Sequence, residues 1–272
     1  ATPQRFHGGW TLNDGSVFGA YADEYDVHRP SYPTSLFALP AFVPPQPSAV
    51  AIDVAAGTGI AGIEIAKRGW RTTAVDHDEG MLQQASMSAS KAGVPIAVLM
   101  TNAETLDGVP PASARLLTCF QAFHWLDAPV ALEAFAATLA PGGHAVLAWN
   151  DRDLSHPWVC DLEAIVEAHN PKYNRDMKQT KVWSEDGAAF TQGGHFTVKD
   201  TYTAANPVTI TGDGLVALMN TMSYVRNALS PEALESFNAA VSALATRHHG
   251  NSPFTLPWQT TAYVLAPATP QQ

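Results

Sequence analysis

Three residues, Asp53, Gly57 and Gly59, lie where they could bind a nucleotide-sized ligand. They follow an apolar run at residues 49–52, which predicts a short strand, and they precede a segment whose apolar residues have helical spacing. Glycine tolerates a sharp turn from strand to helix and lets a ligand approach the main chain. Asp76 ends the next predicted strand, where a carboxylate can accept hydrogen bonds from both ribose hydroxyls. The spacing predicts a cradle for a nucleotide-like group at a helix N-terminus.

This glycine turn has two interpretations. Gly57, Gly59 and Gly62 satisfy G-x-G-x-x-G, the dinucleotide fingerprint, which favours an NAD-binding oxidoreductase. Alternatively, Asp53 comes first, and the stretch resembles acid-x-Gly-x-Gly-x-Gly, the first motif of class I S-adenosylmethionine-dependent methyltransferases, with Ala55 in place of the first glycine. An alanine methyl group fits at that position if the backbone is not left-handed, so the replacement is a mild departure from the family pattern.

Four further segments, within residues 16–150, resemble these methyltransferases. Residues 25–33 are similar to Y-D-x-x-R-P-x-Y-P, which precedes the core in many small-molecule methyltransferases, and residues 75–82 are similar to Val-Asp-x-Ser/Asp-x-x-Met-Leu. Residues 121–127 resemble a signature of the trans-aconitate methyltransferases and their relatives, and residues 141–143 form a typical Pro-Gly-Gly turn. The resemblance implies S-adenosylmethionine as the cofactor and S-adenosylhomocysteine as its product.

The resemblance also implies which residues contact the cofactor. These residues are Asp53, Ala55, Gly57, Gly59, Asp76, Met81, Asn102, Ala103 and Gln121. Asn102 stands where relatives have an Asp that holds the adenine amino group, and its carbonyl can still accept that proton without the charge. The Ala103 amide would meet an adenine ring nitrogen, and Gln121 would contact the methionine moiety through its backbone.

The catalytic and substrate-binding candidates lie outside the glycine turn. His124 could orient the substrate or accept a proton, because its intrinsic pKa lies near neutrality, but it could equally be a buried structural histidine. The candidates for the acceptor pocket are Tyr21, Tyr25, Arg29, Tyr224 and Arg226, for which ordinary packing is the alternative. A carboxylate acceptor would need no base, whereas a hydroxyl acceptor would.

The positions of the apolar runs predict an α/β fold. The expected strands cover residues 49–52, 71–75, 96–100, 114–120, 144–150, 196–203 and 260–265. We expect a Rossmann-like, seven-stranded, mostly parallel sheet with helices on both faces, an N-terminal helical lid and C-terminal helical cap insertions. Within one compact catalytic domain, the lid would span residues 1–47, the cofactor-binding core 48–150, and the cap with the last strands 151–272.

Composition limits the classes of partner and site. The 272-residue chain has a net charge of −10 and only 15 Lys and Arg residues, so no basic field is expected to hold nucleic acid. No apolar stretch approaches the ~18 residues that span a bilayer, so a soluble, cytoplasmic protein with a small-molecule substrate is expected. No metal site is predicted, and His248 and His249 are expected to be solvated. Two cysteines, Cys119 and Cys160, exclude a disulfide framework.

A third hypothesis keeps the cofactor pocket but not the reaction. The chain would then be a binding or scaffold protein of the same fold, or one that uses the bound sulfonium electrostatically for another reaction. The oligomeric state is not predicted by the sequence.

Overall fold

Seven strands form the central sheet of the computed structural model, which describes residues 29–173 and 188–268. The strands are β1 (Val50–Val54), β2 (Arg71–Asp76), β3 (Ile96–Met100), β4 (Ala114–Phe120), β5 (Leu139–Arg152), β6 (Phe196–Ala205) and β9 (Trp258–Pro267). Their order is β3-β2-β1-β4-β5-β9-β6, with β1 to β5 parallel and β9 antiparallel to both of its neighbours. The predicted seven-stranded, mostly parallel sheet is confirmed.

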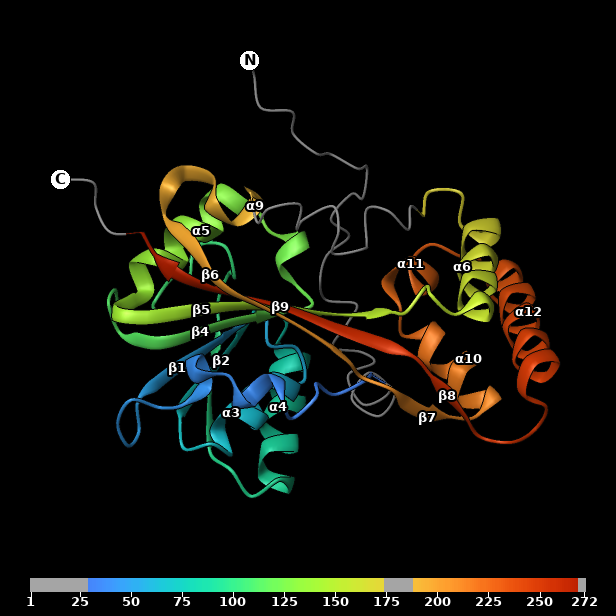
Figure 1. Cartoon of the computed structure of the whole chain (residues 1–272), viewed down its shortest axis with the longest axis horizontal. Helices are drawn as coiled ribbons and strands as arrows, with labels where there is room; N and C mark the ends of the chain where they lie inside the picture. Colours follow the sequence, from blue (N-terminus) through green and yellow to red (C-terminus); the bar gives the residue numbers. More distant parts are fainter. Residues whose placement is uncertain (1–28, 174–187, 269–272) are drawn as a thin grey trace, which may run out of the picture.

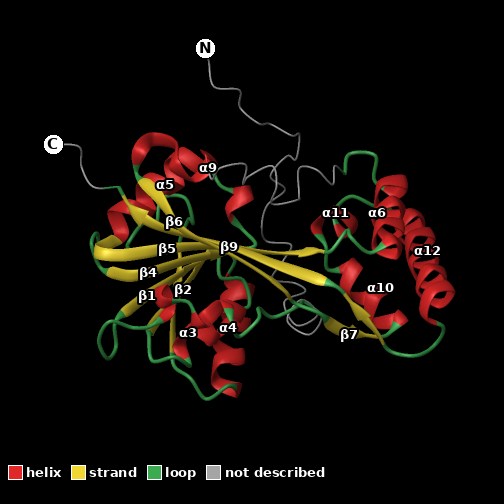
Figure 2. Ribbon diagram, viewed as in Figure 1, coloured by secondary structure: helices red, strands yellow, loops and turns green. Residues whose placement is uncertain are grey.

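Both faces of the sheet are buried, because alternate residues of its central strands enter different cores. On β4, Leu117 and Cys119 pack into one core, and Leu116 and Phe120 pack into the other. The first core is covered by α5 (Ala128–Thr138) and α9 (Ala188–Thr191), and the second by the short helices η1 (Leu36–Ala38) and η2 (Pro40–Phe42) with α3 (Ile60–Ala66). Figure 2 shows these helices, with α4 (Glu79–Lys91), on the two sides of the strands.

Polar caps set the starts of two core helices. Asp78 is the N-cap of α4, and its carboxylate accepts a hydrogen bond from the Met81 amide at 3.1 Å. Asp127 caps α5 through the Val130 amide, with Pro129 in the first turn. Each cap fixes where its helix begins after the preceding strand. The ligand site is expected at the same ends of the strands.

A helical module lies at one end of β5 and β9 (Figure 1). It contains α6 (Pro157–His169), α10 (Gly212–Asn220), α11 (Ser223–Arg226), α12 (Pro231–His249) and the antiparallel pair β7 (Val208–Ile210) and β8 (Phe254–Leu256). These elements share a core of their own around Leu218, Phe237 and Val241. The β7–β8 pair was not predicted, and β5 continues two residues past the predicted boundary at residue 150 because it still pairs with β9 at Arg152 and Trp258.

A buried ion pair joins the module to the sheet. Arg152, from the end of β5, donates through Nε to Glu163 Oε1 on α6 at 2.6 Å, and their side chains are 6% and 4% exposed. Tyr224 OH accepts from Arg152 Nη2 at 2.9 Å, and Tyr173 OH donates to Glu163 Oε2 at 2.7 Å. Burial alone would lower the pKa of Arg152, but the Glu163 carboxylate, Tyr224 and Tyr173 together outweigh it and raise that pKa.

This ion pair could not be predicted from the sequence, because its two residues lie on different elements and no motif relates their spacing.

None of the described helices is long and apolar enough to cross a membrane.

We expect Glu163→Gln to lower the free energy of unfolding by about 3 kcal/mol, because it leaves the Arg152 charge buried without its counter-ion. The matched control is Glu64→Gln. Glu64 also pairs with cations, Lys67 and Arg68, but at the surface, so we expect a loss below about 1 kcal/mol. Urea denaturation measures both losses. Equal losses in the two variants would contradict the larger contribution to stability that we assign to the buried pair.

Candidate functional site

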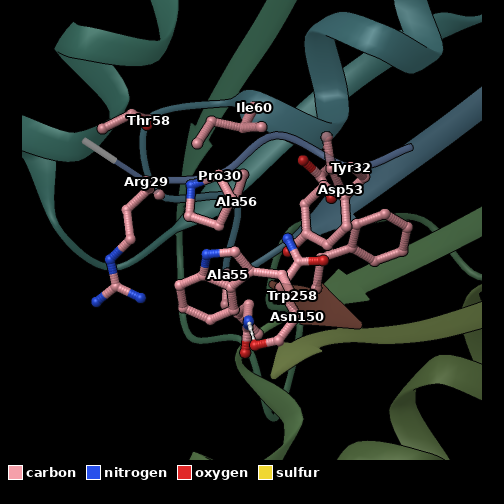
Figure 3. Close-up of a pocket in the computed structure, with 14 residues that line it drawn as sticks. Arg29, Pro30, Tyr32, Asp53, Ala55, Ala56, Thr58, Ile60, Asn150 and Trp258 are labelled. Carbon is pink, nitrogen blue, oxygen red and sulfur yellow. Dashed lines mark hydrogen bonds between the residues drawn. The ribbon is translucent and has the colours of Figure 1, made fainter. Parts of the chain in front are cut away.

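A pocket of about 560 Å³, counting the part open to solvent, lies where β1 turns into α3 (Figure 3). Five of the residues predicted from the sequence line it: Arg29, Asp53, Ala55, Gly57 and Gln121. Nine further lining residues were not predicted: Pro30, Tyr32, Ala56, Thr58, Ile60, Ala61, Phe120, Asn150 and Trp258. The pocket is at the carboxyl edge of the parallel strands, where open α/β sheets bind ligands.

The turn after β1 is left-handed at three positions. Ala55, Gly57 and Gly59 have φ values of 52°, 55° and 82°. The methyl group of Ala55 was expected to fit without strain only if the backbone there was not left-handed, and the backbone is left-handed. A left-handed alanine costs about 1–2 kcal/mol. The turn holds this conformation because the Ala56 amide donates to Val75 O at 3.0 Å, which fixes the chain against β2. The replacement of glycine at Ala55 is therefore less mild than the sequence suggests.

Close packing requires glycine at Gly59 and at Gly62, and the backbone angle also requires it at Gly59. A Cβ atom at Gly59 would lie 3.0 Å from Ala85 Cβ on α4, whereas a Cβ atom at Gly57 would meet nothing within 4 Å. At Gly62, inside α3, a Cβ atom would lie 3.0 Å from Asp53 Oδ2. Gly62 therefore allows α3 to pack closely on β1, which is also the role of the third glycine in the dinucleotide fingerprint, so this contact does not separate the two interpretations.

We expect Gly59→Ala to lower the free energy of unfolding by about 2 kcal/mol or more, since it adds an overpacked methyl group to an unfavourable backbone angle. Gly57→Ala is the matched control. It has the same left-handed strain but no steric contact, so the expected loss is about 1 kcal/mol. Urea denaturation of the two variants measures the difference, and a loss at Gly57 equal to or larger than that at Gly59 would refute the packing argument.

Asp76 ties the glycine turn to the end of β2. Its Oδ2 atom accepts from the Gly57 amide at 2.8 Å, and its Oδ1 atom accepts from the Asp78 amide at 3.0 Å. Burial by itself would raise the pKa of Asp76, but hydrogen bonds from His77 and from the Gly57 and Asp78 amides hold it below its ordinary value. A carboxylate has about four acceptor sites, so these bonds leave capacity for ribose hydroxyls. The ribose contact itself stays a prediction.

Asp53 has a different environment, although it ends the neighbouring strand. It is 1% exposed, its Oδ1 atom accepts from Thr118 Oγ1 at 2.6 Å, and its Oδ2 atom lies toward Gly62 without a hydrogen bond of ordinary geometry. Burial raises the pKa of Asp53 to about 7, against the opposing effect of the Thr118 hydroxyl. A cationic group in the pocket would favour the ionised form.

We expect the free energy of unfolding to fall as the pH rises from about 4 to about 7. The pKa of Asp53 is about 7 in the folded chain and near 4 when unfolded, so the folded state keeps a proton that the unfolded state releases. Below about pH 4 both states hold the proton, and above about pH 7 neither does. Asp53→Asn, which keeps an acceptor for Thr118, should flatten this decline in urea titrations from pH 5 to 8. The same decline in the free energy of unfolding in the unmodified chain and in Asp53→Asn would contradict the assignment of this decline to Asp53.

Gln121 and Asn150 form the polar wall opposite the turn. Gln121 has a φ of 57°, its amide donates to Ala148 O at 2.8 Å, and its Nε2 atom donates to Asn150 O at 2.6 Å. Asn150 Nδ2 donates to the Ser31 carbonyl at 3.2 Å, and Asn206 Nδ2 donates to the same carbonyl at 2.7 Å. These contacts place the segment from residue 29 onward against the pocket. Asn150 could have been found from its place at the carboxyl end of a predicted parallel strand.

Arg29 lines the pocket and also contacts the helical module. Its Nε atom donates to Thr221 Oγ1 at 3.1 Å, and its Nη2 atom donates to Thr221 O at 3.0 Å. This agrees with its predicted place beside the site. Tyr21 and Tyr25, the other predicted residues of that segment, lie outside the described residues.

His124 is half-buried in the short helix η3 (Phe123–Trp125) and is not among the residues that line the described pocket. Its Nδ1 atom accepts a hydrogen bond from Trp149 Nε1 at 3.2 Å. In a neutral imidazole this acceptor role at Nδ1 assigns the hydrogen to Nε2. His124 in this state carries its ring hydrogen on Nε2, and its role as an orienting group, a base or a structural residue stays a prediction.

Three other predicted cofactor residues lie apart from the described pocket. Met81 is buried on α4, and Ala103 is buried after β3. Asn102 is exposed, and its Oδ1 atom accepts from the Glu104 amide at 2.6 Å. That acceptor, which we assigned to the adenine amino group, is therefore already used in a local turn.

Two predicted substrate residues belong to the helical module. Tyr224 is 5% exposed, bonds to Arg152 and packs against Tyr173 with ring centroids 4.6 Å apart, so it supports the core of the module. Burial raises the pKa of its hydroxyl. Arg226 is partly exposed on α11 and is not among the lining residues of the described pocket. Within the described ranges, no group of three His, Cys, Asp or Glu side chains could hold a metal ion.

Comparison with known proteins gives a domain match and partial relatives. Residues 51–143 match the family model described as a methyltransferase domain. An uncharacterized methyltransferase of Mycobacterium tuberculosis (strain ATCC 25618 / H37Rv) is 32% identical over 156 residues, which cover 57% of this chain and 59% of that protein. An S-adenosyl-L-methionine-dependent Diels-Alderase of Talaromyces variabilis is 33% identical over 100 residues, which cover 35% of this chain and 34% of that one. In both cases the match spans less than two thirds of the relative.

One solved structure shares the fold over most of both chains. The S-adenosylmethionine-dependent methyltransferase from Geobacter sulfurreducens, in complex with S-adenosyl-L-homocysteine, superposes with a TM-score of 0.54 at 17% identity, covering 91% of this chain and 97% of that one. This superposition confirms the predicted Rossmann-like fold. The domain match agrees with the predicted methyltransferase class for residues 51–143.

Proposed function

We propose that this chain, which carries an S-adenosylmethionine-dependent methyltransferase domain at residues 51–143, transfers the cofactor's methyl group to an oxygen atom of a small, partly apolar acceptor. The observation that carries this proposal is the pocket above the left-handed turn after β1. One wall of the pocket is main chain at Gly57, and another is the buried Asp53 carboxyl. We also keep the division into a lid (1–47), a core (48–150) and a cap (151–272) as part of the proposal.

The side chains at the turn fit an adenosyl sulfonium in three respects. Gly57 adds no Cβ atom to the pocket, so a ligand can approach the main chain there. Asp53 has an unpartnered buried oxygen, Oδ2, and a carboxylate there would be stabilised by a positively charged ligand. Asp76 holds the turn in place and retains acceptor capacity for a ribose.

The bound cofactor supplies an electrophilic methyl group, and the chain supplies position. Asn150 and Gln121 hold the wall opposite the turn, and the segment that begins at Arg29 closes the pocket on that side. Holding reactants in a near-attack geometry can contribute roughly 7–11 kcal/mol of the barrier. His124, with Trp149 donating to Nδ1, would offer Nε2–H to an acceptor oxygen and orient it.

The acceptor class rests on the lining of the pocket and on the resemblance at residues 121–127. The aromatic rings of Tyr32, Phe120 and Trp258 and the aliphatic side chain of Ile60 supply apolar surface, which suits a partly apolar small molecule. The resemblance to trans-aconitate methyltransferases supports a carboxylate as the oxygen nucleophile, which needs no general base. The net charge of −10 supports a small molecule over a nucleic acid.

A second candidate function is supported by the relationship to the Diels-Alderase. That relative is named for an S-adenosylmethionine-dependent reaction that is not methyl transfer, and it is 33% identical over 100 residues. The same pocket would then bind the sulfonium and use its charge without transferring the methyl group.

We expect the chain to bind S-adenosylhomocysteine and not NADH in titration calorimetry, and to transfer label from methyl-labelled S-adenosylmethionine to members of a panel of small carboxylic acids and phenols. Asp76→Asn should weaken S-adenosylhomocysteine binding about tenfold or more, because a charge-assisted hydrogen bond is worth about 1.5–3 kcal/mol.

The matched control is Asp107→Asn, at an exposed carboxylate that bonds only locally to Thr105, for which we expect unchanged binding. NADH binding without S-adenosylhomocysteine binding would overturn the proposal in favour of an oxidoreductase. Tight cofactor binding with no labelled product from any acceptor would favour the second candidate.

A further inference from the structure

The pocket wall contains a buried hydrogen-bond donor that no described residue accepts. Trp258, at the start of β9, is 4% exposed and lines the pocket, and its Nε1 atom has no hydrogen-bond partner. Burying an N–H group without an acceptor is unfavourable for folding, so such a group at a ligand site points to an acceptor on the ligand.

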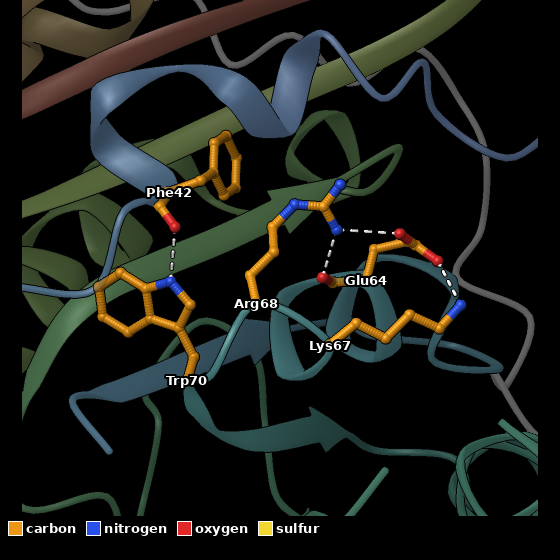
Figure 4. Close-up of polar contacts among 5 residues, drawn as sticks. All are labelled: Phe42, Glu64, Lys67, Arg68 and Trp70. Atoms are coloured by element: carbon orange, nitrogen blue, oxygen red, sulfur yellow. Dashed lines mark hydrogen bonds and ion pairs between the residues drawn. The ribbon is translucent and has the colours of Figure 1, made fainter. Parts of the chain in front are cut away.

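The other tryptophans buried in the described ranges show that an unpaired indole is the exception in this chain. Trp70 and Trp149 are 4% and 3% exposed. Trp70 Nε1 donates to Phe42 O at 2.7 Å (Figure 4), and Trp149 Nε1 donates to His124 Nδ1 at 3.2 Å. Trp258 differs from both because its ring is part of the pocket wall (Figure 3).

The surroundings of Trp258 favour a negatively charged acceptor. The amide groups of Gln121 and Asn150 that line the same pocket already donate to main-chain carbonyls. Arg29 lines the pocket and brings a positive charge to it. Among the donors in the lining of the pocket, the Arg29 guanidinium carries a positive charge, and the Trp258 indole and the Thr58 hydroxyl have no hydrogen-bond partner among the described residues.

We propose that Trp258 Nε1 donates a hydrogen bond to the α-carboxylate of the methionine part of S-adenosylmethionine. This inference rests on the proposed function. The carboxylate is the anionic group of that cofactor, and Gln121, which we assign to the methionine moiety, lines the pocket together with Trp258. If the ribose binds at Asp76, whose carboxylate accepts the Gly57 amide at 2.8 Å, the methionine end would enter the pocket that Gly57 and Trp258 both line.

Trp258→Phe removes the N–H group and keeps an aromatic ring, and its effect depends on the ligand. We expect S-adenosylhomocysteine to bind about tenfold more weakly, the loss of one charge-assisted hydrogen bond. Binding of 5′-methylthioadenosine, which has the same thioether nucleoside but no amino-acid carboxylate, should be unchanged. Trp70→Phe is the matched control, since it removes a buried indole away from the pocket, and it should leave the affinity for both ligands unchanged while lowering the melting temperature.

A second measurement on the unmodified chain does not depend on the variant folding. In ¹H–¹⁵N spectra, the Trp258 indole signal, assigned through its backbone connectivities, should move downfield with S-adenosylhomocysteine and stay in place with 5′-methylthioadenosine.

Each other outcome is decisive. Equal losses for the two ligands in Trp258→Phe would mean that the ring acts by packing alone, and an unchanged affinity with an unmoved indole signal would mean that the carboxylate lies elsewhere; either overturns the inference and leaves the proposed function intact. If the unmodified chain binds neither ligand, the proposed function itself fails.

Discussion

The hydrogen bond from the Gly57 amide to the Asp76 carboxylate is the contact on which the site is built. It joins the left-handed turn after β1 to the end of β2, and the same carboxylate accepts the Asp78 amide just before α4 begins. One ionised side chain therefore fixes the turn, the strand end and the helix start. Burial disfavours the charge of Asp76, but the hydrogen bonds from the surrounding donors outweigh the effect of burial. The geometry of the turn and the charge of Asp76 therefore stabilise each other.

Asp53 and Asp76 end neighbouring strands and are 1% and 6% exposed, yet their pKa values shift in opposite directions. Asp76 accepts two main-chain amides, which favour its ionised form. Asp53 has one hydroxyl donor, from Thr118, and an oxygen with no partner, so burial decides its pKa. The site thus combines a carboxylate whose surroundings favour the ionised form with one whose charge depends on what lies beside it.

The elements that were predicted correctly depend on local signals. The seven strands were predicted from apolar runs, and the turn was predicted from Gly57 and Gly59. What the sequence did not reveal depends on partners far along the chain. Tyr224 is a core residue because Arg152 reaches it from the end of β5, and Trp258 faces the pocket because β9 enters the sheet beside β5. No spacing rule connects such residues, since only the assembled sheet brings them together.

Ser31 is held in place through its main-chain carbonyl, which accepts hydrogen bonds from the side-chain amides of Asn150 and Asn206. A carbonyl is common to all amino acids, so the side chain at position 31 is free to vary during evolution without moving this wall of the pocket. The position of the wall depends instead on two asparagines, which lie 119 and 175 positions further along the chain. The position of this wall of the pocket is thus independent of the side chain at position 31.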